Sequence, residues 1–262
     1  MTQRESRVLA LFRRSVLKQR KLAEIETALG PSEGLSCLDL GSDNGVVSLL
    51  LRRRGGHWTS ADLTDEAVSA IRELVQTDVH RLHDEQLPFP DAAFDRVVVV
   101  DMLEHVANEG RFVAELGRVT KSGGLLVVNT PHMKDTALRR FRHWLGQTDE
   151  KHGHLRGGYT LPRLESLLGG AFRVERHHTY SRFFSELIDT AINWAVERLG
   201  KQGSAKGMVV TGQDVDRHHK LFLAYSVIYP LVWLFSRLDQ LIPWASGYML
   251  IATLSRRDHT QT

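Results

Sequence analysis

The stretch CLDLGSDNGVVSLLLRRRG, residues 37–55, contains the transition that determines the fold. An apolar run is followed by a turn with two glycines, Gly41 and Gly45, and then by a helical pattern of apolar residues. A strand, a glycine turn and a helix N-terminus form a nucleotide-binding corner, because glycines let the backbone approach a ligand closely. The spacing differs from the Gly-x-Gly-x-x-Gly pattern that holds a pyrophosphate. With carboxylates at Asp39 and Asp43, the turn suits a cation or an amine better than a pyrophosphate.

Asp43 occupies the middle of this turn, at a position where such loops usually carry glycine. Aspartate and asparagine tolerate the left-handed backbone better than most residues, so the turn can survive the change. Three interpretations follow. Asp43 and Asn44 supply ordinary turn chemistry, Asp43 contacts an amine of the ligand directly, or Asp43 marks the loss of ligand binding.

Strands and helices alternate along most of the chain, which predicts an α/β domain with a parallel sheet and helices on both faces. The expected strands are 35–40, 57–62, 78–82, 96–102, 123–130, 172–180 and 248–256. The expected helices are 5–29, 45–54, 65–75, 109–120, 134–146, 161–168 and, less sharply bounded, roughly 181–200 and 214–238. We therefore expect an N-terminal amphipathic helix within 1–30, a nucleotide-binding domain at 31–180 and 247–257, and a hydrophobic helical insert at 181–246.

Bulk composition narrows the class of protein. The chain has 262 residues, a net charge of +3, 42% hydrophobic residues and a single cysteine. These values are ordinary for a soluble globular protein, and one cysteine excludes a disulfide framework. The N-terminus lacks the apolar core of a signal peptide, and no run reaches the ~18 apolar residues of a membrane span. We expect a cytoplasmic protein, with peripheral contact at the inner face of the membrane as a variant of that expectation.

Polar and ionisable residues follow several expected strands, and the carboxyl ends of parallel strands meet at one edge of the sheet. Asp62 ends the second strand, about 20 residues after the glycine turn, where it can accept hydrogen bonds from ribose hydroxyls. The fourth strand, the fifth strand and the loop after them supply candidate catalytic acids and bases. These candidates are Asp101, Glu104, His105, His132, His154 and Tyr159.

Four segments taken together resemble the class I S-adenosylmethionine-dependent methyltransferases. They are LDLGSDNG (38–45), SADLT (60–64), LPFPDAAFDRVVVVDMLEHV (87–106) and GGLLVVNTPH (123–132). The resemblance covers roughly 35–178 together with the last strand. It implies a Rossmann-like seven-stranded sheet whose last strand is antiparallel, and S-adenosyl-L-methionine as the cofactor.

The resemblance also implies roles for individual residues. Gly41 and Gly45 would approach the methionine part of the cofactor, and Asp39 would orient their turn. Asp62 would bind the ribose, and Leu63 would pack on the adenine. The acid near the adenine amine would be Asp84, preferred here to His83. The implied cofactor-binding set is Asp39, Gly41, Asp43, Gly45, Asp62, Leu63, Asp84 and Asp101.

The segment DMLEHV resembles two branches of this family. One branch is the O-methyltransferases of ubiquinone biosynthesis. The other is the small-RNA 3′-end methyltransferases, in which acid-x-x-Glu-His and a distant histidine hold a divalent metal. Carried over, the metal ligands would be Asp101, Glu104, His105 and His154, although Asp101 is one methylene shorter than the glutamate of those families. The alternatives are a histidine base that works without metal, and a purely structural segment.

The insert contains LFLAYSVIYPLVWLF, residues 221–235, which is apolar on every face. Such a helix is buried or lies in lipid, and fifteen residues span about 22 Å as a helix, too short for a ~30 Å hydrocarbon core. Three roles are open: extra core or a lid over the substrate, a homodimer interface, or a monotopic membrane contact. With the apolar residues of 181–196, the insert predicts a hydrophobic cover over the site and a hydrophobic acceptor.

The favoured hypothesis is therefore methyl transfer to an oxygen of a hydrophobic, prenylated or lipid-linked small molecule, such as a phenol or a lipid-linked sugar. Arginines 139, 140, 142 and 156 either meet a phosphate or carboxylate of this substrate or form a solvated basic face. An RNA methyltransferase is an alternative, supported by the basic N-terminal helix and the metal-like segment, but no RNA-binding motif is present. A non-catalytic regulatory protein that binds S-adenosylmethionine is a second alternative, based on Asp43.

Overall fold

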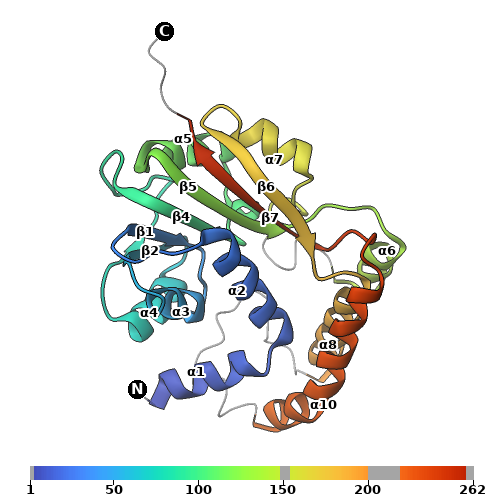
Figure 1. Ribbon diagram of the computed structural model, residues 1–262. Coiled ribbons are helices and arrows are strands. Elements are labelled where there is room, and N and C mark those ends of the chain that lie inside the picture. The colour runs from blue at the N-terminus through green and yellow to red at the C-terminus, as the bar shows by residue number, and fades with distance from the viewer. Residues whose placement is uncertain (1–2, 148–153, 200–218, 258–262) are drawn as a thin grey trace.

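The computed structural model describes residues 3–147, 154–199 and 219–257 (Figure 1). Its centre is a seven-stranded sheet in the order β3-β2-β1-β4-β5-β7-β6. The strands are β1 (Ser36–Leu40), β2 (His57–Asp62), β3 (Val79–Arg81), β4 (Phe94–Val100), β5 (Thr120–Pro131), β6 (Phe172–Tyr180) and β7 (Met249–Arg256). Strands β1 to β5 pair in parallel, and β7 is antiparallel to both β5 and β6. The predicted seven-stranded sheet with an antiparallel last strand is confirmed.

Helices cover both faces of this sheet (Figure 1). The helices are α1 (Gln3–Arg13), α2 (Val16–Leu29), α3 (Val46–Arg52), α4 (Asp65–Val75), α5 (Glu109–Val119), α6 (Ala137–Trp144), α7 (Leu161–Leu168), α8 (Phe183–Leu199) and α10 (His219–Leu238). Two short 3-10 helices, η1 (Leu103–His105) and η3 (Asp239–Leu241), follow β4 and α10. Helix α4 begins after Thr64, whose side chain accepts from the Ala67 N–H and caps the helix.

The sheet is buried on both faces because its central strands carry apolar residues on both of their faces. In β4, Val97 and Val99 belong to one core cluster, while Val98 and Val100 belong to another on the opposite face. This alternation follows from the two-residue period of a strand. Helices α5 and α7 contribute to the first cluster, and α2 and α3 contribute to the second.

The N-terminal segment forms two helices where the sequence predicts one. The helix is interrupted before Ser15, and the Ser15 side chain accepts a hydrogen bond from the Lys18 N–H and caps α2. The apolar face of α2 enters the core of the sheet through Leu22, Ile25 and Leu29. Helix α2 is therefore part of the main domain, and its other face is available to the cavity described below.

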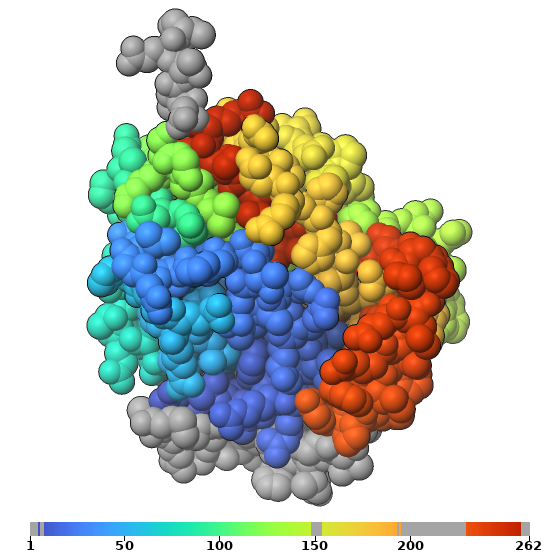
Figure 2. All heavy atoms as spheres, viewed as in Figure 1, coloured from blue at the N-terminus to red at the C-terminus, as the bar shows by residue number. Residues whose placement is uncertain are grey.

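Helices α8 and α10 lie side by side, and α6 packs against α8 (Figure 1). In the space-filling view, α10 lies next to the N-terminal helices on the same face (Figure 2). Asp239 joins the two insert helices, because its buried carboxylate accepts from the backbone N–H groups of Arg182, Phe184 and Ser185 at the start of α8. Residues 200–218 of the predicted insert lie outside the described residues. Within the described part of the chain, no helix is both long and apolar enough to cross a membrane.

Candidate functional site

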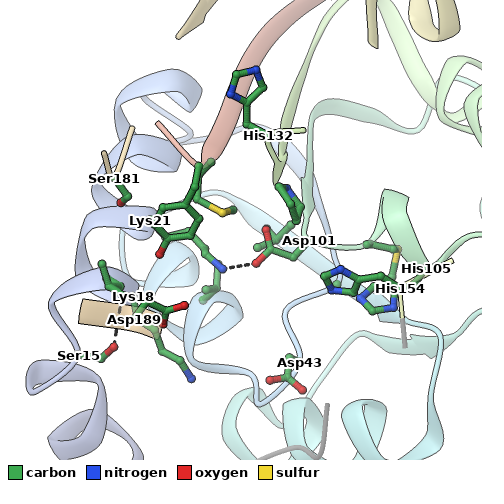
Figure 3. Close-up of a pocket in the computed structure, with 18 of the residues that line it drawn as sticks. Ser15, Lys18, Lys21, Asp43, Asp101, His105, His132, His154, Ser181 and Asp189 are labelled. Atoms are coloured by element: carbon green, nitrogen blue, oxygen red, sulfur yellow. Dashed lines mark hydrogen bonds and ion pairs between the residues drawn. The ribbon is translucent and has the colours of Figure 1, made fainter. Parts of the chain in front are cut away.

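A cavity of about 1070 Å³ opens at the carboxyl ends of the parallel strands. Its walls come from α2, from the loops after β1, β2, β4 and β5, and from α6 and α8 (Figure 3). The cavity brings together most of the residues that the sequence singled out. Its lining includes Gly41, Asp43, Asp62, Leu63, Asp101, His105, His132 and His154. Five other predicted site residues do not line it, namely Asp39, Gly45, Asp84, Glu104 and Tyr159.

Asp39 organises the glycine turn from beneath. Its side chain is fully buried, and its carboxylate accepts from the hydroxyls of Ser42, Ser48 and Ser60 at 2.7, 2.6 and 2.7 Å. Arg52 of α3 adds an ion pair at 3.3 Å. These contacts tie the end of β1 to β2 and to α3, so Asp39 can orient the turn without touching a ligand.

The two glycines are required by packing as well as by backbone conformation. Gly41 has φ +83°, and a Cβ atom there would lie 2.3 Å from the carbonyl oxygen of Val100. Gly45 has φ +80°, and its Cβ would lie 2.8 Å from the Cα of Ile71 in α4. Asp43 adopts φ +52°, the left-handed conformation that the sequence predicts it to tolerate. Only Gly41 and Asp43 of these three face the cavity.

Asp62, at the end of β2, connects the turn to the cavity. One carboxylate oxygen accepts from the Leu63 N–H at 2.7 Å, and the other accepts from the Asp43 N–H at 3.2 Å. Burial raises the pKa of Asp62 to about 6, although these backbone hydrogen bonds lower it. Asp84, the predicted partner of the adenine amine, is exposed and lies outside the cavity lining. That assignment stays a prediction without geometric support.

Asp101 follows β4 directly and adopts φ +44°. Its carboxylate accepts from the Asn129 side-chain amide at 2.6 Å and pairs with the Lys21 ammonium (Figure 3). Asn129 in turn accepts from the Tyr180 hydroxyl at 2.5 Å. Burial lowers the pKa of Lys21, but Asp101 outweighs it, so the pKa lies above its usual value and Lys21 stays charged. Sequence reasoning missed Lys21, because a basic residue on an amphipathic helix carries no local sign that it faces a cavity.

Glu104, His105 and His154 form a compact group. The two histidines of this group lie near Asp101 in the cavity wall (Figure 3). Glu104 is fully buried, and one of its oxygens accepts from the Thr130 hydroxyl at 3.1 Å. Its other oxygen has no hydrogen-bond partner among the described residues. Burial and the charge of Asp101 raise the pKa of Glu104 to about 8. The rings of His105 and His154 meet edge to face, with their centroids 4.8 Å apart.

This group provides three of the four predicted metal ligands. One donor atom from each of Glu104, His105 and His154 lies within 4.8 Å of the others. One carboxylate and two imidazoles form a donor set that suits a divalent ion such as Zn²⁺. Asp101 does not belong to the group, because Lys21 and Asn129 engage its carboxylate. The residues thus fit a three-ligand site in part, and a bound metal stays a prediction.

His132 and Tyr159, the remaining predicted catalytic residues, differ in their surroundings. The Nδ1 atom of His132 lies 2.9 Å from the carbonyl oxygen of Gly247. A carbonyl only accepts, so Nδ1 carries the proton and the neutral ring keeps Nε2 as its basic nitrogen. Tyr159 is fully buried, its hydroxyl donates to the Glu109 carboxylate and lies 3.0 Å from the Leu103 carbonyl oxygen, and burial raises its pKa. Tyr159 therefore supports the loop, and we do not assign it a step in the reaction.

The outer wall of the cavity is charged, where the sequence predicts an apolar cover. Helices α6 and α8 and the residues around them contribute Lys134, Arg139, Arg142, Glu186 and Asp189 to the lining. Many large apolar side chains of α6, α8, α10, η3 and the turn after η3 are exposed instead. They are Phe141, Trp144, Phe183, Trp194, Leu231, Trp233, Leu234, Leu241 and Trp244. An apolar helix pattern does not say which face meets solvent, which explains the difference.

Comparisons with known proteins agree with this geometry. Residues 38–128 match a family model described as a methyltransferase domain. The demethylmenaquinone methyltransferase of Tropheryma whipplei (strain Twist) is 31% identical over 144 residues, which cover 53% of this chain and 55% of that protein. The ubiquinone biosynthesis O-methyltransferase of Maricaulis maris (strain MCS10) is 32% identical over 106 residues, 38% of this chain and 42% of that protein. The chain spans about half the length of the curated relatives that it matches.

A solved structure extends the likeness of fold to nearly the whole chain. The [4+2]-cyclase SpnF superposes with a TM-score of 0.61 at 18% identity, covering 92% of this chain and 81% of that one. At this identity the likeness shows the fold alone, and function has to be argued from the site. The family match and the relatives confirm the predicted resemblance to S-adenosylmethionine-dependent methyltransferases and to their ubiquinone branch.

Proposed function

We propose, from the methyltransferase domain at residues 38–128, that this chain transfers a methyl group from S-adenosylmethionine to an oxygen of an amphiphilic or lipid-linked small molecule. The observation that carries the proposal is that one continuous cavity holds both sets of residues. It joins the glycine turn and Asp62 to His105, His132 and His154. A relative named as a ubiquinone biosynthesis O-methyltransferase supports oxygen as the methylated atom.

The cofactor supplies a methyl group on a positively charged sulfur, which needs no further activation. Asp62 would accept from the ribose hydroxyls, and the half-buried Leu63 would offer an apolar surface to the adenine. Lys21 and Asp101 present opposite charges to the amino-acid part of the ligand. The cofactor end of the cavity carries the carboxylates of Asp43, Asp62 and Asp101 against the ammonium groups of Lys18 and Lys21. This excess of one negative charge favours a cationic ligand.

Methylation of a hydroxyl forms an O–C bond as the C–S bond breaks, and the hydroxyl proton has to leave. We assign this proton to a histidine of the cavity wall, because imidazole titrates near neutral pH. The paired rings of His105 and His154 are our first assignment. His132 is the second, since its tautomer leaves Nε2 able to accept a proton.

The outer surface of the insert supports an acceptor that resides in or near a membrane. Exposed tryptophans lie on α6, α8, α10 and the turn after η3, and the Arg237 guanidinium stacks over Trp233 at 4.9 Å. Tryptophan beside arginine is typical of segments that lie at a lipid interface. An amphiphile held there could place its polar head in the charged cavity.

Transfer of radiolabelled methyl groups from S-adenosylmethionine to a membrane-lipid extract tests the proposal. We expect label in the organic phase with the wild-type protein. His105→Ala and His154→Ala should each lower kcat at least tenfold while the Kd for S-adenosylhomocysteine stays within about twofold, since a lost general base typically costs 10²–10⁴ in rate. His177→Ala, on the exposed face of β6, is the control. Label in RNA alone, or no label in any acceptor, would favour the alternatives and contradict the proposal.

Removal of metal tests whether Glu104, His105 and His154 hold a metal ion or whether a histidine acts as a base without one. We expect prolonged dialysis against a chelator to leave kcat unchanged and elemental analysis to find no stoichiometric metal. A metal that copurifies and disappears in Glu104→Gln, with loss of turnover, would instead assign Glu104, His105 and His154 as ligands.

A further inference from the structure

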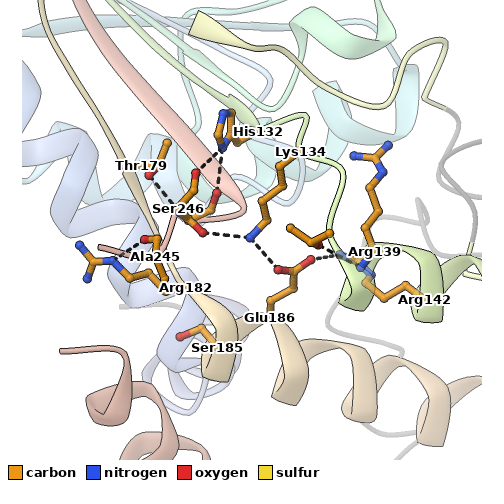
Figure 4. Close-up of polar contacts among 12 residues, drawn as sticks. His132, Lys134, Arg139, Arg142, Thr179, Arg182, Ser185, Glu186, Ala245 and Ser246 are labelled. Carbon is orange, nitrogen blue, oxygen red and sulfur yellow. Dashed lines mark hydrogen bonds and ion pairs between the residues drawn. The ribbon is translucent and has the colours of Figure 1, made fainter. Parts of the chain in front are cut away.

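We infer that Lys134, Arg139 and Arg142 form a subsite that binds a phosphate or carboxylate group of the acceptor. The inference rests on the proposed methyl transfer and specifies the chemical class of the molecule that accepts it. It starts from the charged outer wall of the cavity, which the cofactor end does not use (Figure 4).

Helix α6 has two different faces along its length. Arg139 and Arg142 are three residues apart, so they project from the same side of the helix, and both line the cavity. Phe141 and Trp144 have the same spacing, stack on each other with centroids 5.8 Å apart, and are exposed. The helix therefore separates a basic cavity wall from an apolar outer surface, which is the arrangement that an amphiphile with an anionic head requires.

A buried carboxylate holds these cations in place without neutralising all of them (Figure 4). The Glu186 side chain is 3% exposed, and its carboxylate accepts a hydrogen bond from the Lys134 ammonium at 2.8 Å. The same carboxylate lies 3.9 Å from the nearest nitrogen of Arg142, longer than a hydrogen bond. Glu186 thus attracts Arg142 by charge, and within the described part of the chain no hydrogen bond occupies the guanidinium donors of Arg142, so a ligand can use them.

The charges of the cavity divide into two halves of opposite sign. Among the described residues of the outer wall, three cations face the carboxylates of Glu186 and Asp189, which leaves one excess positive charge in that set. At the turn, Asp43, Asp62 and Asp101 face Lys18 and Lys21, which leaves one excess negative charge. The negative half suits the sulfonium, and the positive half suits an anion such as a phosphate ester or a carboxylate.

Gln147 gives an independent indication of a ligand on this wall. Its side chain is 2% exposed and lines the cavity, and its amide nitrogen donates to the Thr190 carbonyl at 2.9 Å. Its amide oxygen is buried without a hydrogen-bond partner among the described residues. Buried acceptors of this kind are normally satisfied, and a hydroxyl on the head group of the acceptor would satisfy this one.

Two neighbouring arginines serve as internal comparisons. Arg156 donates to the carbonyls of Leu103 and Val106 at 3.0 and 2.6 Å, so its guanidinium supports the loop. Arg139 donates to the loop carbonyl of Gly157 at the longer distance of 3.3 Å. Arg140, on α6 itself, is exposed and pairs with Asp135 at 3.4 Å. Of the four arginines that the sequence marked around these loops, only Arg139 and Arg142 line the cavity.

Calorimetric titration of the protein saturated with S-adenosylhomocysteine tests the subsite. The probes are octyl phosphate and octyl glucoside, each below its micelle concentration, and inorganic phosphate. Octyl phosphate should bind wild-type protein at least tenfold more tightly than octyl glucoside. Arg142→Gln and Arg139→Gln should each weaken octyl phosphate at least tenfold, Arg142→Lys less, and Arg140→Gln not at all. Charge-assisted hydrogen bonds to an anion justify this factor.

Comparison of octyl phosphate with inorganic phosphate also identifies the source of the anion. Octyl phosphate that binds much more tightly than inorganic phosphate assigns the subsite to a lipid head group, whereas equal affinities assign it to a soluble metabolite. Unchanged octyl phosphate affinity in both arginine-to-glutamine variants, or no preference over octyl glucoside, would overturn the subsite. The affinity for S-adenosylhomocysteine, measured first in each variant, reports separately on the fold and on the proposed cofactor site.

Discussion

At the scale of single residues, the proposed cofactor site depends on contacts that hold the glycine turn against the ends of β2 and β4. Asp39 gathers three hydroxyls beneath the turn, and Gly41 lets the turn pass close to the Val100 carbonyl. The sequence predicted this corner well, because glycine and buried aspartate carry strong local meaning. It could not predict Lys21, whose contact with Asp101 joins residues 80 positions apart.

Substitution of Gly41 tests the tight contact. Gly41→Ala should lower the free energy of unfolding by about 1–3 kcal/mol and weaken S-adenosylhomocysteine binding, because its Cβ collides with the Val100 carbonyl. Urea denaturation and calorimetry measure the two effects. Gly34→Ala is the matched control, since Gly34 also has a positive φ of +73° but no atom lies within 4 Å of its Cβ. Equal losses in both variants would show that backbone strain alone matters.

The raised pKa of Asp62 predicts a pH dependence of cofactor affinity. Ribose hydroxyls bind the ionised carboxylate, so the affinity for S-adenosylhomocysteine should fall up to about tenfold as the pH drops from 7.5 to 5, through the pKa of about 6. The effect on stability has the opposite sign. A pKa raised by folding means that the contribution of this group to stability decreases as the pH rises from about 4 to about 6. Asp62→Asn lacks the titrating carboxylate and should show no such pH dependence. An equally flat affinity in the wild-type protein would refute the assignment.

At the scale of elements, the order of strands and helices was easier to predict than their ends. The valine-rich strands β4 and β5 overlap the predicted strands, but β4 begins and ends two residues earlier and β5 begins three residues earlier than predicted. The break between α1 and α2 was not predictable from periodicity, because apolar residues continue at helical spacing on both sides of Ser15. The break nevertheless matters, since it turns α2 so that Lys18 and Lys21 line the cavity.

Helix α8 depends on a cap from outside its own sequence. Asp239→Ala should lower the free energy of unfolding by about 1–2 kcal/mol, because it removes the acceptor for the backbone N–H groups of Arg182, Phe184 and Ser185. Asp135→Ala, at an exposed carboxylate, is the control and should change stability by less than about 0.5 kcal/mol. Chemical denaturation compares the two, and equal stabilities would remove the cap from the account.

At the scale of the whole molecule, the fold was predictable and the character of the cavity wall was not. The alternation of strands and helices determines a sheet with one ligand edge. The insert, in contrast, is apolar on most of its faces, so its sequence did not reveal that charged residues of α8 face inward while Trp194 and Phe183 are exposed. The charged side chains of α2, α6 and α8 come together around the cavity only in the folded molecule.

The exposed apolar surface predicts membrane contact by the intact protein. We expect co-sedimentation with phosphatidylglycerol vesicles, reduced at least threefold by the double change Leu241→Ser and Trp244→Ser, whose side chains are 67% and 80% exposed. Leu155→Ser, at an exposed leucine outside α6, α8 and α10, is the control. Wild-type protein that stays in the supernatant, or that forms dimers through this surface instead, would contradict the membrane contact.

The central claim is that the turn at 41–45 and the carboxylate of Asp62 bind S-adenosylmethionine, and calorimetry of that binding tests it most directly. The account predicts one site per chain in the wild-type protein and at least a tenfold weaker affinity in Asp62→Ala, with the fold retained. Absence of binding to the wild-type protein, or an affinity unchanged by Asp62→Ala, would contradict the account.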